Sequence, residues 1–220
     1  MDPDQRRSLL RERLIGAAEH AIATQGLSAL KARDLARDAG CAVGAIYNVF
    51  PDLDGLVLEV NLRTLALFEA AVARSGEGAA PPAGGAEGAV DELVRLALTY
   101  LAFTQAHGLR WRALFQHRMS GGVVPDWYRA EQGRLFRYIE APLSRLCPGL
   151  PDAERALRAR SLFSSTHGLV SLGLDEKLMS VPFPVLAREV EVIVRALGHG
   201  LASGAAASGP ALAPSEKGLG

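Results

Sequence analysis

The stretch GLSALKARDLARDAGCAVGAIYNVFPDLDGLV, residues 26–57, decides how this chain folds. Its apolar residues recur at spacings of three and four, which places them on one face of successive short helices. Gly40 interrupts the pattern and predicts a tight turn. Two short helices joined by such a turn form a helix-turn-helix, whose second helix enters the major groove of DNA. The residues that can share the buried face are Leu35, Ala36, Ala39, Val43, Ile46, Tyr47 and Phe50.

Helical periodicity continues along the rest of the chain, and strand patterns are scarce. Glycine and proline separate the periodic segments, as they do between helices. The sequence therefore predicts an all-α fold with about nine helices. We expect them at residues 6–25, 32–39, 43–49, 51–74, 89–106, 109–119, 126–146, 152–174 and 184–202.

The pattern also predicts a division into functional parts. Residues 1–50 are expected to form a helix-turn-helix DNA-binding domain, and residues 51–203 a helical ligand-binding and dimerisation domain. The first helix of the second domain, 51–74, connects the two. Residues 75–88 are rich in Gly, Ala and Pro and are expected to be a flexible linker. Residues 204–220 have little to bury and are expected to be disordered.

Bulk properties exclude several classes of protein. The chain of 220 residues is 49% hydrophobic, but no apolar run is long enough for a membrane span. The charged N-terminus is unlike a secretory signal. With only two cysteines, Cys41 and Cys147, a disulfide scaffold is not expected, and a reducing cytoplasm suits the chain. The formal net charge of +0 counts against nucleic-acid binding, but residues 1–50 carry seven basic and six acidic residues, a net of about +1 that a dimer would double and that weakly indicates DNA.

Sequence patterns of enzymes are absent. There is no phosphate-binding glycine loop, no HExxH and no Gly-x-Ser-x-Gly elbow, so no catalytic residue is expected. His167 has no second ligand at metal-site spacing on its helix, and a structural hydrogen bond is the favoured role. Neither a metal nor a cofactor is expected.

With these features together, the N-terminal portion resembles the tetracycline-repressor (TetR) family of bacterial regulators. The resemblance covers about fifty residues. It implies a cytoplasmic homodimer that binds a palindromic operator in double-stranded DNA, and most simply a repressor that a small-molecule inducer releases. Residues 166–172 resemble one C-terminal subclass marked by Trp-x-x-His-Gly, although Ser164 stands at the Trp position. The residues that carry the N-terminal pattern are Arg33-Asp34-Leu35-Ala36, Ala39-Gly40, Gly44-Ala45-Ile46-Tyr47, Phe50 and Leu56.

Three positions depart from the family pattern. Ala42 replaces the small hydroxyl residue that caps the recognition helix against a phosphate, and Leu53 replaces a lysine that contacts the DNA backbone. Lys31 replaces a threonine near the start of the preceding helix. Each lost contact would cost about 1 kcal/mol per half-site.

The recognition surface is expected on the second short helix. If Ile46 and Phe50 point inward, the other side of that helix turns toward the groove, where Gly44 permits close approach and Asn48 can pair with an adenine edge. A half-buried core position is the competing interpretation for Tyr47. The predicted DNA contacts are Lys31, Arg33, Ala42, Val43, Gly44, Tyr47 and Asn48.

Aromatic residues recur at helical spacings in the second domain. By resemblance they would line an inducer cavity for an apolar or aromatic molecule, with His117 or His167 as polar groups. For any single residue, simple core packing is the better interpretation. The predicted ligand contacts are Phe68, Tyr100, Phe103, Trp111, Phe115, Met119, Trp127, Phe163 and His167.

The last two helices are expected to pair with their copies in a symmetric dimer. Small residues in the helix over 152–174 allow another helix to pack closely against it. The next helix has a wide apolar face. An intramolecular core is the competing interpretation. The predicted interface residues are Ser161, Ser165, Gly168, Leu172, Val190, Ile193, Val194 and Leu197.

Two other functions stay open at this point. One is a small-molecule or redox-sensing module whose DNA binding has decayed, with Cys41 as the redox residue and Ala42 and Leu53 as the signs of decay. The other is an all-helical enzyme that uses His167. The sequence does not identify the operator, the inducer, the regulated genes, or whether the output is repression or activation.

Overall fold

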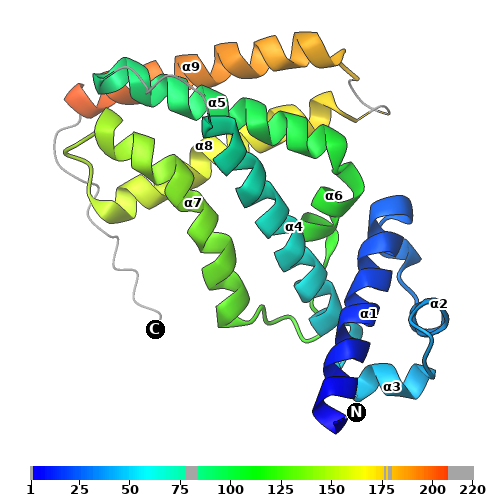
Figure 1. The fold of residues 1–220 in the computed structure, drawn as a ribbon. Helices are drawn as coiled ribbons and strands as arrows, with labels where there is room; N and C mark the ends of the chain where they lie inside the picture. The colour runs from blue at the N-terminus through cyan, green and yellow to red at the C-terminus, as the bar shows by residue number, and fades with distance from the viewer. Residues whose placement is uncertain (1, 78–83, 176, 178–179, 208–220) are drawn as a thin grey trace, which may run out of the picture. The chain divides into compact units, whose positions relative to one another are not determined.

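The computed structural model describes residues 2–77, 84–175, 177 and 180–207, and within them the chain is helical with no strand (Figure 1). The all-α fold is therefore confirmed. The elements are α1 (Pro3–Gln25), the 3-10 helix η1 (Leu27–Ala29), α2 (Ala32–Asp38), α3 (Val43–Tyr47), α4 (Leu53–Gly76), α5 (Gly85–Ala106), α6 (Gly108–Gln116), α7 (Asp126–Leu146), α8 (Asp152–Gly173) and α9 (Phe183–Ala207).

Local chemistry explains where the helices begin and end. α1 begins at Pro3, three residues earlier than expected, because proline suits a first helical turn whose N–H groups have no partner. It ends at Gly26, whose φ of 83° favours glycine. Asp52 caps α4 by accepting a hydrogen bond from the Gly55 N–H at 2.8 Å, so this helix begins at Leu53 rather than at Pro51.

Two expected irregular segments are partly helical. α4 continues to Gly76 and α5 begins at Gly85, so both ends of the expected linker 75–88 belong to helices. Its residues 78–83 lie outside the described part. α9 continues to Ala207, which corrects the expected helix end at residue 202. The remainder of the expected tail, 208–220, also lies outside the described residues.

The chain divides into two compact units by its internal contacts. Unit 1 comprises Met1–Ala79 and Thr99–Leu135, and unit 2 comprises Ala80–Leu98 and Phe136–Gly220. Long helices α5 and α7 each contribute residues to both. Compactness and function are separate criteria, so the expected boundary of the DNA-binding domain at residue 50 stays a prediction.

The core of unit 1 is built around α1. Leu14, Ile15, Ala18 and Ile22 are all fully buried, at the three- and four-residue spacing of one helix face. They pack with the apolar faces of α2, α3 and the start of α4, and with Ala113 from α6. The three N-terminal helices, α4 and α6 therefore share one hydrophobic core.

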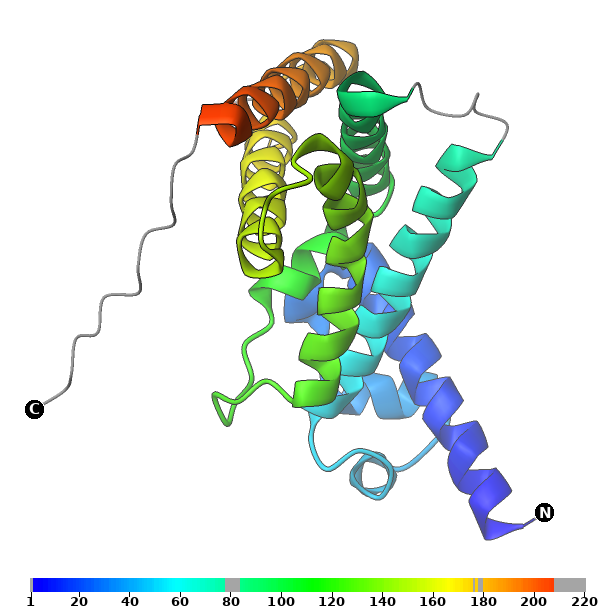
Figure 2. The ribbon, with the colours of Figure 1, turned by 90° about the vertical axis from the view of Figure 1, so that its left-hand side faces the viewer.

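In unit 2, α8 and α9 pack against each other (Figures 1 and 2). Gly173 of α8 permits this approach, because an added Cβ would lie only 2.6 Å from a Leu186 methyl group. Arg195 of α9 pairs with Asp91 of α5 at 2.8 Å, which links α9 to the first half of α5. Among the described residues, no helix is long and apolar enough to cross a membrane.

Candidate nucleic-acid interface and ligand groove

The short helices α2 and α3 meet at a turn whose geometry needs glycine. Gly40 adopts a φ of 64°, in the left-handed region that side chains disfavour. Ile46 and Phe50 are buried at 0% and 4% exposure, as expected for the inner face of α3. Val43 and Tyr47 are 38% and 50% exposed, so their placement in the shared buried face was wrong. They lie on the opposite side of α3, where a recognition helix meets DNA.

The predicted DNA contacts lie on α2 and α3 or directly before or after them, and we call these seven exposed residues together the α3 surface. It leaves room for close approach, since nothing lies within 4 Å of a Cβ added at Gly44. Half of the Tyr47 ring area is open to solvent, which argues against a purely structural role. All seven predicted residues are exposed: Lys31, Arg33, Ala42, Val43, Gly44, Tyr47 and Asn48.

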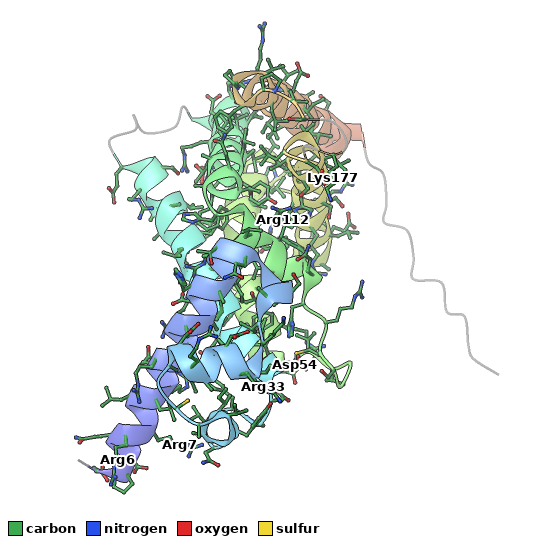
Figure 3. The ribbon with its side chains drawn as sticks, turned by 90° about the vertical axis from the view of Figure 1, so that its right-hand side faces the viewer. Arg6, Arg7, Arg33, Asp54, Arg112 and Lys177 are labelled. Carbon is green, nitrogen blue, oxygen red and sulfur yellow. The ribbon has the colours of Figure 1, made fainter. Side chains whose placement is uncertain are left out.

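The charges around the α3 surface are of two kinds. Arg37 is held by Asp34 at 2.9 Å and Asp38 at 3.0 Å, and these carboxylates, Asp38 foremost, raise the pKa of its guanidinium. Lys31, the N-cap residue of α2, and Arg33, on α2 itself, are exposed and form no ion pair in the described part of the chain. Arg33 projects from α2 (Figure 3). These two cations are available for phosphates.

The departures from the family pattern have structural consequences. Ala42 is the N-cap of α3 and supplies no side-chain hydrogen bond, so the first amides of this helix lack a side-chain cap. Leu53 packs against the core of unit 1, and Cys41 does so as well. Leu53 therefore supplies apolar packing where the family has a lysine that contacts the DNA backbone. The packing of Cys41 against the same core weakens the redox interpretation.

A network of ion pairs joins α1 to α4 and α6. Glu19 of α1 accepts hydrogen bonds from Arg63 of α4 at 3.2 Å and from Arg110 of α6 at 2.8 Å. Arg110 also donates from Nε to the hydroxyl of Thr64 on α4 at 3.3 Å. Glu19 and Arg110 are mostly buried, at 21% and 14% side-chain exposure, so this pair is screened less by salt than a surface pair.

A second polar contact joins the segment after α6 to the start of α4. Asp54 accepts a hydrogen bond from the Ser120 N–H at 2.7 Å, and its other oxygen lies 3.5 Å from His117 Nε2. His117, expected as a polar group for the inducer, thus faces a carboxylate at the base of the connecting helix. The ring nitrogen itself has no hydrogen-bond partner, so the Ser120 N–H is the group that joins this segment to α4.

Most of the predicted ligand residues form a packed aromatic cluster instead of a cavity. Trp111 is 3% exposed, and its ring centroid lies 5.3 Å from those of Phe68 and Tyr100 and 5.5 Å from that of Phe103. The Trp111 Nε1–H donates to the Tyr100 hydroxyl at 2.8 Å. Phe115 stands at the edge of the cluster and is 48% exposed. For these residues, core packing is the better interpretation.

A groove of about 440 Å³ lies between α4 and the first turns of α7. Of the predicted ligand residues, Trp127 lines it, with 49% of its surface exposed. Sequence periodicity missed the others, because they are charged and apolar residues on helix flanks rather than an aromatic set. The lining residues are Glu59, Leu62, Arg63, Leu65, Ala66, Glu69, Trp127, Glu131, Arg134 and Leu135.

Charges in this groove are largely paired. Arg134 of α7 donates to Glu69 of α4 at 2.8 Å, and Arg63 pairs with Glu12 and Glu19 of α1. The groove therefore combines apolar side chains with charged side chains that are paired with opposite charges. Met119, another predicted ligand residue, is partly buried in the segment before α7 and is not among the lining residues.

Two buried polar atoms lie between α4 and α7 without a hydrogen-bond partner. They are Asn61 Oδ1 and the Tyr128 hydroxyl, on residues that are 1% and 4% exposed. Burial raises the pKa of Tyr128, although side-chain hydrogen bonds from Asn61 and Gln132, which are too poorly aligned to satisfy the hydroxyl, oppose that rise. Such atoms are uncommon in a folded interior and mark a place that a polar ligand group or a water can satisfy.

Phe163 and His167 belong to unit 2, apart from the aromatic cluster. Their rings stack at 5.6 Å, and the Ser171 hydroxyl lies 3.3 Å from His167 Nε2. Burial lowers the pKa of His167, which favours the neutral ring. The structural hydrogen bond expected of His167 is present. No group of three potential metal ligands occurs among the described residues.

The predicted dimer residues fall into two sets. Val190 and Val194 are 0% and 4% exposed within the single chain, so they belong to its core and offer little surface to a partner. Gly168 and Leu197 are partly buried. The exposed members Ser161, Ser165, Leu172 and Ile193 lie on outward stripes of α8 and α9, and the sequence prediction missed further members of these stripes: Leu157, Val185 and Val192.

Two family profiles match this chain. Residues 14–60 match the family described as bacterial regulatory proteins, tetR family. Residues 93–197 match a tetracyclin repressor-like C-terminal domain. Together they take in the second half of α1 to the start of α4, and the chain from within α5 to within α9. No curated protein matches the sequence significantly.

Solved structures of similar fold agree with the profiles. A tetR-family transcriptional regulator from Streptomyces coelicolor is 20% identical with a TM-score of 0.63, covering 96% of this chain and 92% of its own. PfmR, a TetR family regulator from Thermus thermophilus, is 18% identical with a TM-score of 0.57, covering 84% and 97%. A putative fatty acid metabolism regulator of Clostridium perfringens is 15% identical with a TM-score of 0.58, covering 84% and 97%. At these identities the likeness shows the fold alone.

Proposed function

This chain belongs to the TetR family of ligand-responsive DNA-binding regulators, and from that premise we propose that it is a repressor which a small apolar or aromatic molecule releases from a palindromic operator. The observation that carries the DNA-binding part is the α3 surface. Ile46 and the nearby Phe50 are buried on the inner side of α3. Val43, Tyr47 and Asn48 are exposed on its outer side. A bacterial regulator of this kind acts in the cytoplasm, where the chromosome lies.

A symmetric homodimer supplies the second half-site. The outward stripe of α8 includes Leu157 and Leu172, at 61% and 48% exposure, and that of α9 includes Val185 and Val192, at 50% and 51%. Small residues between the two leucines, Ser161 and Ser165, allow helices to approach closely. Burial of these stripes in a two-fold interface matches the symmetry of a palindrome.

The ligand is proposed to enter the groove between α4 and α7. Trp127 offers an aromatic face there, and Leu62, Leu65 and Leu135 supply apolar contacts. Pockets of this kind combine apolar walls with a few polar groups. Asn61 Oδ1 and the Tyr128 hydroxyl, which lack a hydrogen bond of good geometry, lie between the same two helices and would bind a polar group of a ligand that separates these helices.

The proposed coupling runs through α4 and α6. A ligand that shifts α4 changes the spacing of the two recognition helices, which must be about 34–36 Å to fit successive major grooves. α6 lies against α1 through Ala113 and the pair of Arg110 with Glu19. A coupling free energy of about 1–3 kcal/mol would lower operator affinity roughly 5–150-fold.

Binding to DNA from upstream of the protein's own gene, measured by fluorescence anisotropy over a salt series, tests the proposal. We expect specific binding by a dimer with a steep salt dependence. Tyr47→Ala should abolish it, whereas Val123→Ala, at an exposed large hydrophobic residue outside α2 and α3, should not. If Tyr47→Ala binds as tightly as the wild type while remaining a folded dimer, the α3 surface is not the interface.

The release step has its own test. Aromatic compounds titrated into the protein–operator complex should lower its anisotropy, and Trp127→Ala should weaken that response without changing operator affinity. Ligand that saturates the protein and leaves operator affinity unchanged would refute the repressor mechanism.

A further inference from the structure

The first two turns of α1 extend beyond the core of unit 1. Residues 3–9 are all exposed, whereas the buried stripe of α1 begins at Leu14, with Leu10 partly buried. Helices in proteins are stabilised mainly by the packing of one face, so the fold does not explain this overhang. The overhang also precedes residue 14, where the match to the family profile begins. Its residues therefore have no assigned role.

The faces of α1 show where the overhang points. An Arg13 guanidinium nitrogen lies 3.8 Å from a Cβ added at Gly40, so this face reaches the turn between α2 and α3. Arg6 lies on the same face, seven residues earlier, or about 10 Å along the axis. The Arg11 guanidinium lies over the Phe50 ring at 5.6 Å, next to the end of α3. Arg7 lies on that face one turn earlier, about 6 Å along the axis.

Ion pairing distinguishes Arg6 and Arg7 from Arg11, which follows them on α1. Arg11 is paired with Glu59 of α4, whereas neither Arg6 nor Arg7 forms an ion pair within the described residues. Figure 3 shows both on the first turns of α1, at the same end of unit 1 as Arg33 on α2. Asp2 and Asp4 lie beside them, at the positive end of the helix, which partly offsets these carboxylates.

We propose that Arg6 and Arg7 bind backbone phosphates of the operator, outside the contacts made by the α3 surface. Guanidinium groups suit this role, because they bind phosphate oxygens in a bidentate manner. Phosphate contacts fix the position of a protein on the duplex and carry no base preference. The overhang thus adds a cationic clamp to a helix-turn-helix that lacks a capping hydroxyl at Ala42 and a lysine at Leu53. This inference rests on operator binding by the α3 surface.

The test compares Arg6→Ala/Arg7→Ala with the charge-matched control Arg112→Ala/Lys177→Ala, whose residues are exposed on α6 and after α8. Operator affinity is measured by anisotropy from 50 to 200 mM salt, together with one unrelated duplex of equal length. Four phosphate contacts per dimer make the slope of log K against log salt shallower by about 3.6 when they are lost. Over this fourfold salt range, the wild type then loses about 150-fold more affinity than the variant.

We expect this change for the α1 variant, on both duplexes, while the control keeps the wild-type slope. Arg6→Lys/Arg7→Lys should restore most of the slope. A slope equal to that of the wild type overturns the proposal, as does an equal change in the control. An affinity loss with unchanged slope also overturns it, since that result indicates a structural role. If the wild type binds no operator at all, the proposed function fails instead.

Discussion

Unit 1 contains two aromatic regions that look alike in sequence and differ in the structure. The cluster around Trp111 is buried, with ring centroids 5.3–6.0 Å apart between Phe68, Tyr100 and Trp111. Trp127, on α7, stands half exposed on the wall of a groove of about 440 Å³. Aromatic side chains fill cores and line ligand sites with the same apolar surface. The lesson is that aromatic spacing alone does not separate a core from a ligand site.

The largest expected difference is between alanine substitutions at the two tryptophans. Trp111→Ala removes a fully packed ring and leaves a cavity, so the free energy of unfolding should fall by about 3–5 kcal/mol. Trp127→Ala should change it by less than about 1 kcal/mol, because half of that ring already contacts water. Urea unfolding followed by circular dichroism measures both. Equal losses at the two positions would remove the distinction between core and groove.

The two buried tyrosines next to these tryptophans sharpen the comparison. The Tyr100 hydroxyl accepts the indole N–H of Trp111, so Tyr100→Phe leaves a buried donor without a partner and should cost about 1–3 kcal/mol. The Tyr128 hydroxyl has no hydrogen bond of good geometry, so Tyr128→Phe should change the free energy of unfolding by less than about 1 kcal/mol. Thermal unfolding of the two variants at one protein concentration provides the measurement. Destabilisation by Tyr128→Phe would reveal a partner for its hydroxyl.

A smaller effect is expected from the stacked Phe163–His167 pair of unit 2. Burial lowers the pKa of His167 in the folded state below its unfolded value of about 6.5. The unfolded chain then binds more protons than the folded chain between these two pKa values. The contribution of His167 to the free energy of unfolding is therefore fully present above about pH 6.5 and is lost as the pH falls through the folded pKa. His167→Gln should flatten this part of the stability profile. An unchanged profile, measured by urea unfolding from pH 5 to 8, would contradict the prediction.

The helix-turn-helix was the part most open to prediction. Alternation of buried and exposed positions and the glycine at the turn are local signals, and the structure has both. Val43 and Tyr47 were placed both in the shared buried face and among the outward DNA contacts, because a helix of five residues is too short for spacing to define its buried side; their exposure agrees with the outward placement.

The second domain was predictable as helices but not as surfaces. All four predicted interface residues of α9 are apolar and fall at helical spacing: Val190, Ile193, Val194 and Leu197. The sequence does not separate them, and only packing against neighbouring helices shows which of them stay exposed to solvent. The exposed Leu157 and Val185 were missed for the same reason. A wide apolar face can supply both a core and an interface, so its sequence does not divide the two.

By itself, the sequence determined the helices, the turn at Gly40 and the family, since these depend on residues close together in the chain. Tertiary structure decided which apolar faces stay exposed, that Trp111 is core while Trp127 lines a groove, and that Glu19 joins Arg63 to Arg110. It also decided that α1 extends past its core with Arg6 and Arg7. The physical reason is that burial and ion pairing depend on residues far apart in the chain, such as the 44 and 91 residues that separate Glu19 from Arg63 and Arg110, which no local pattern specifies.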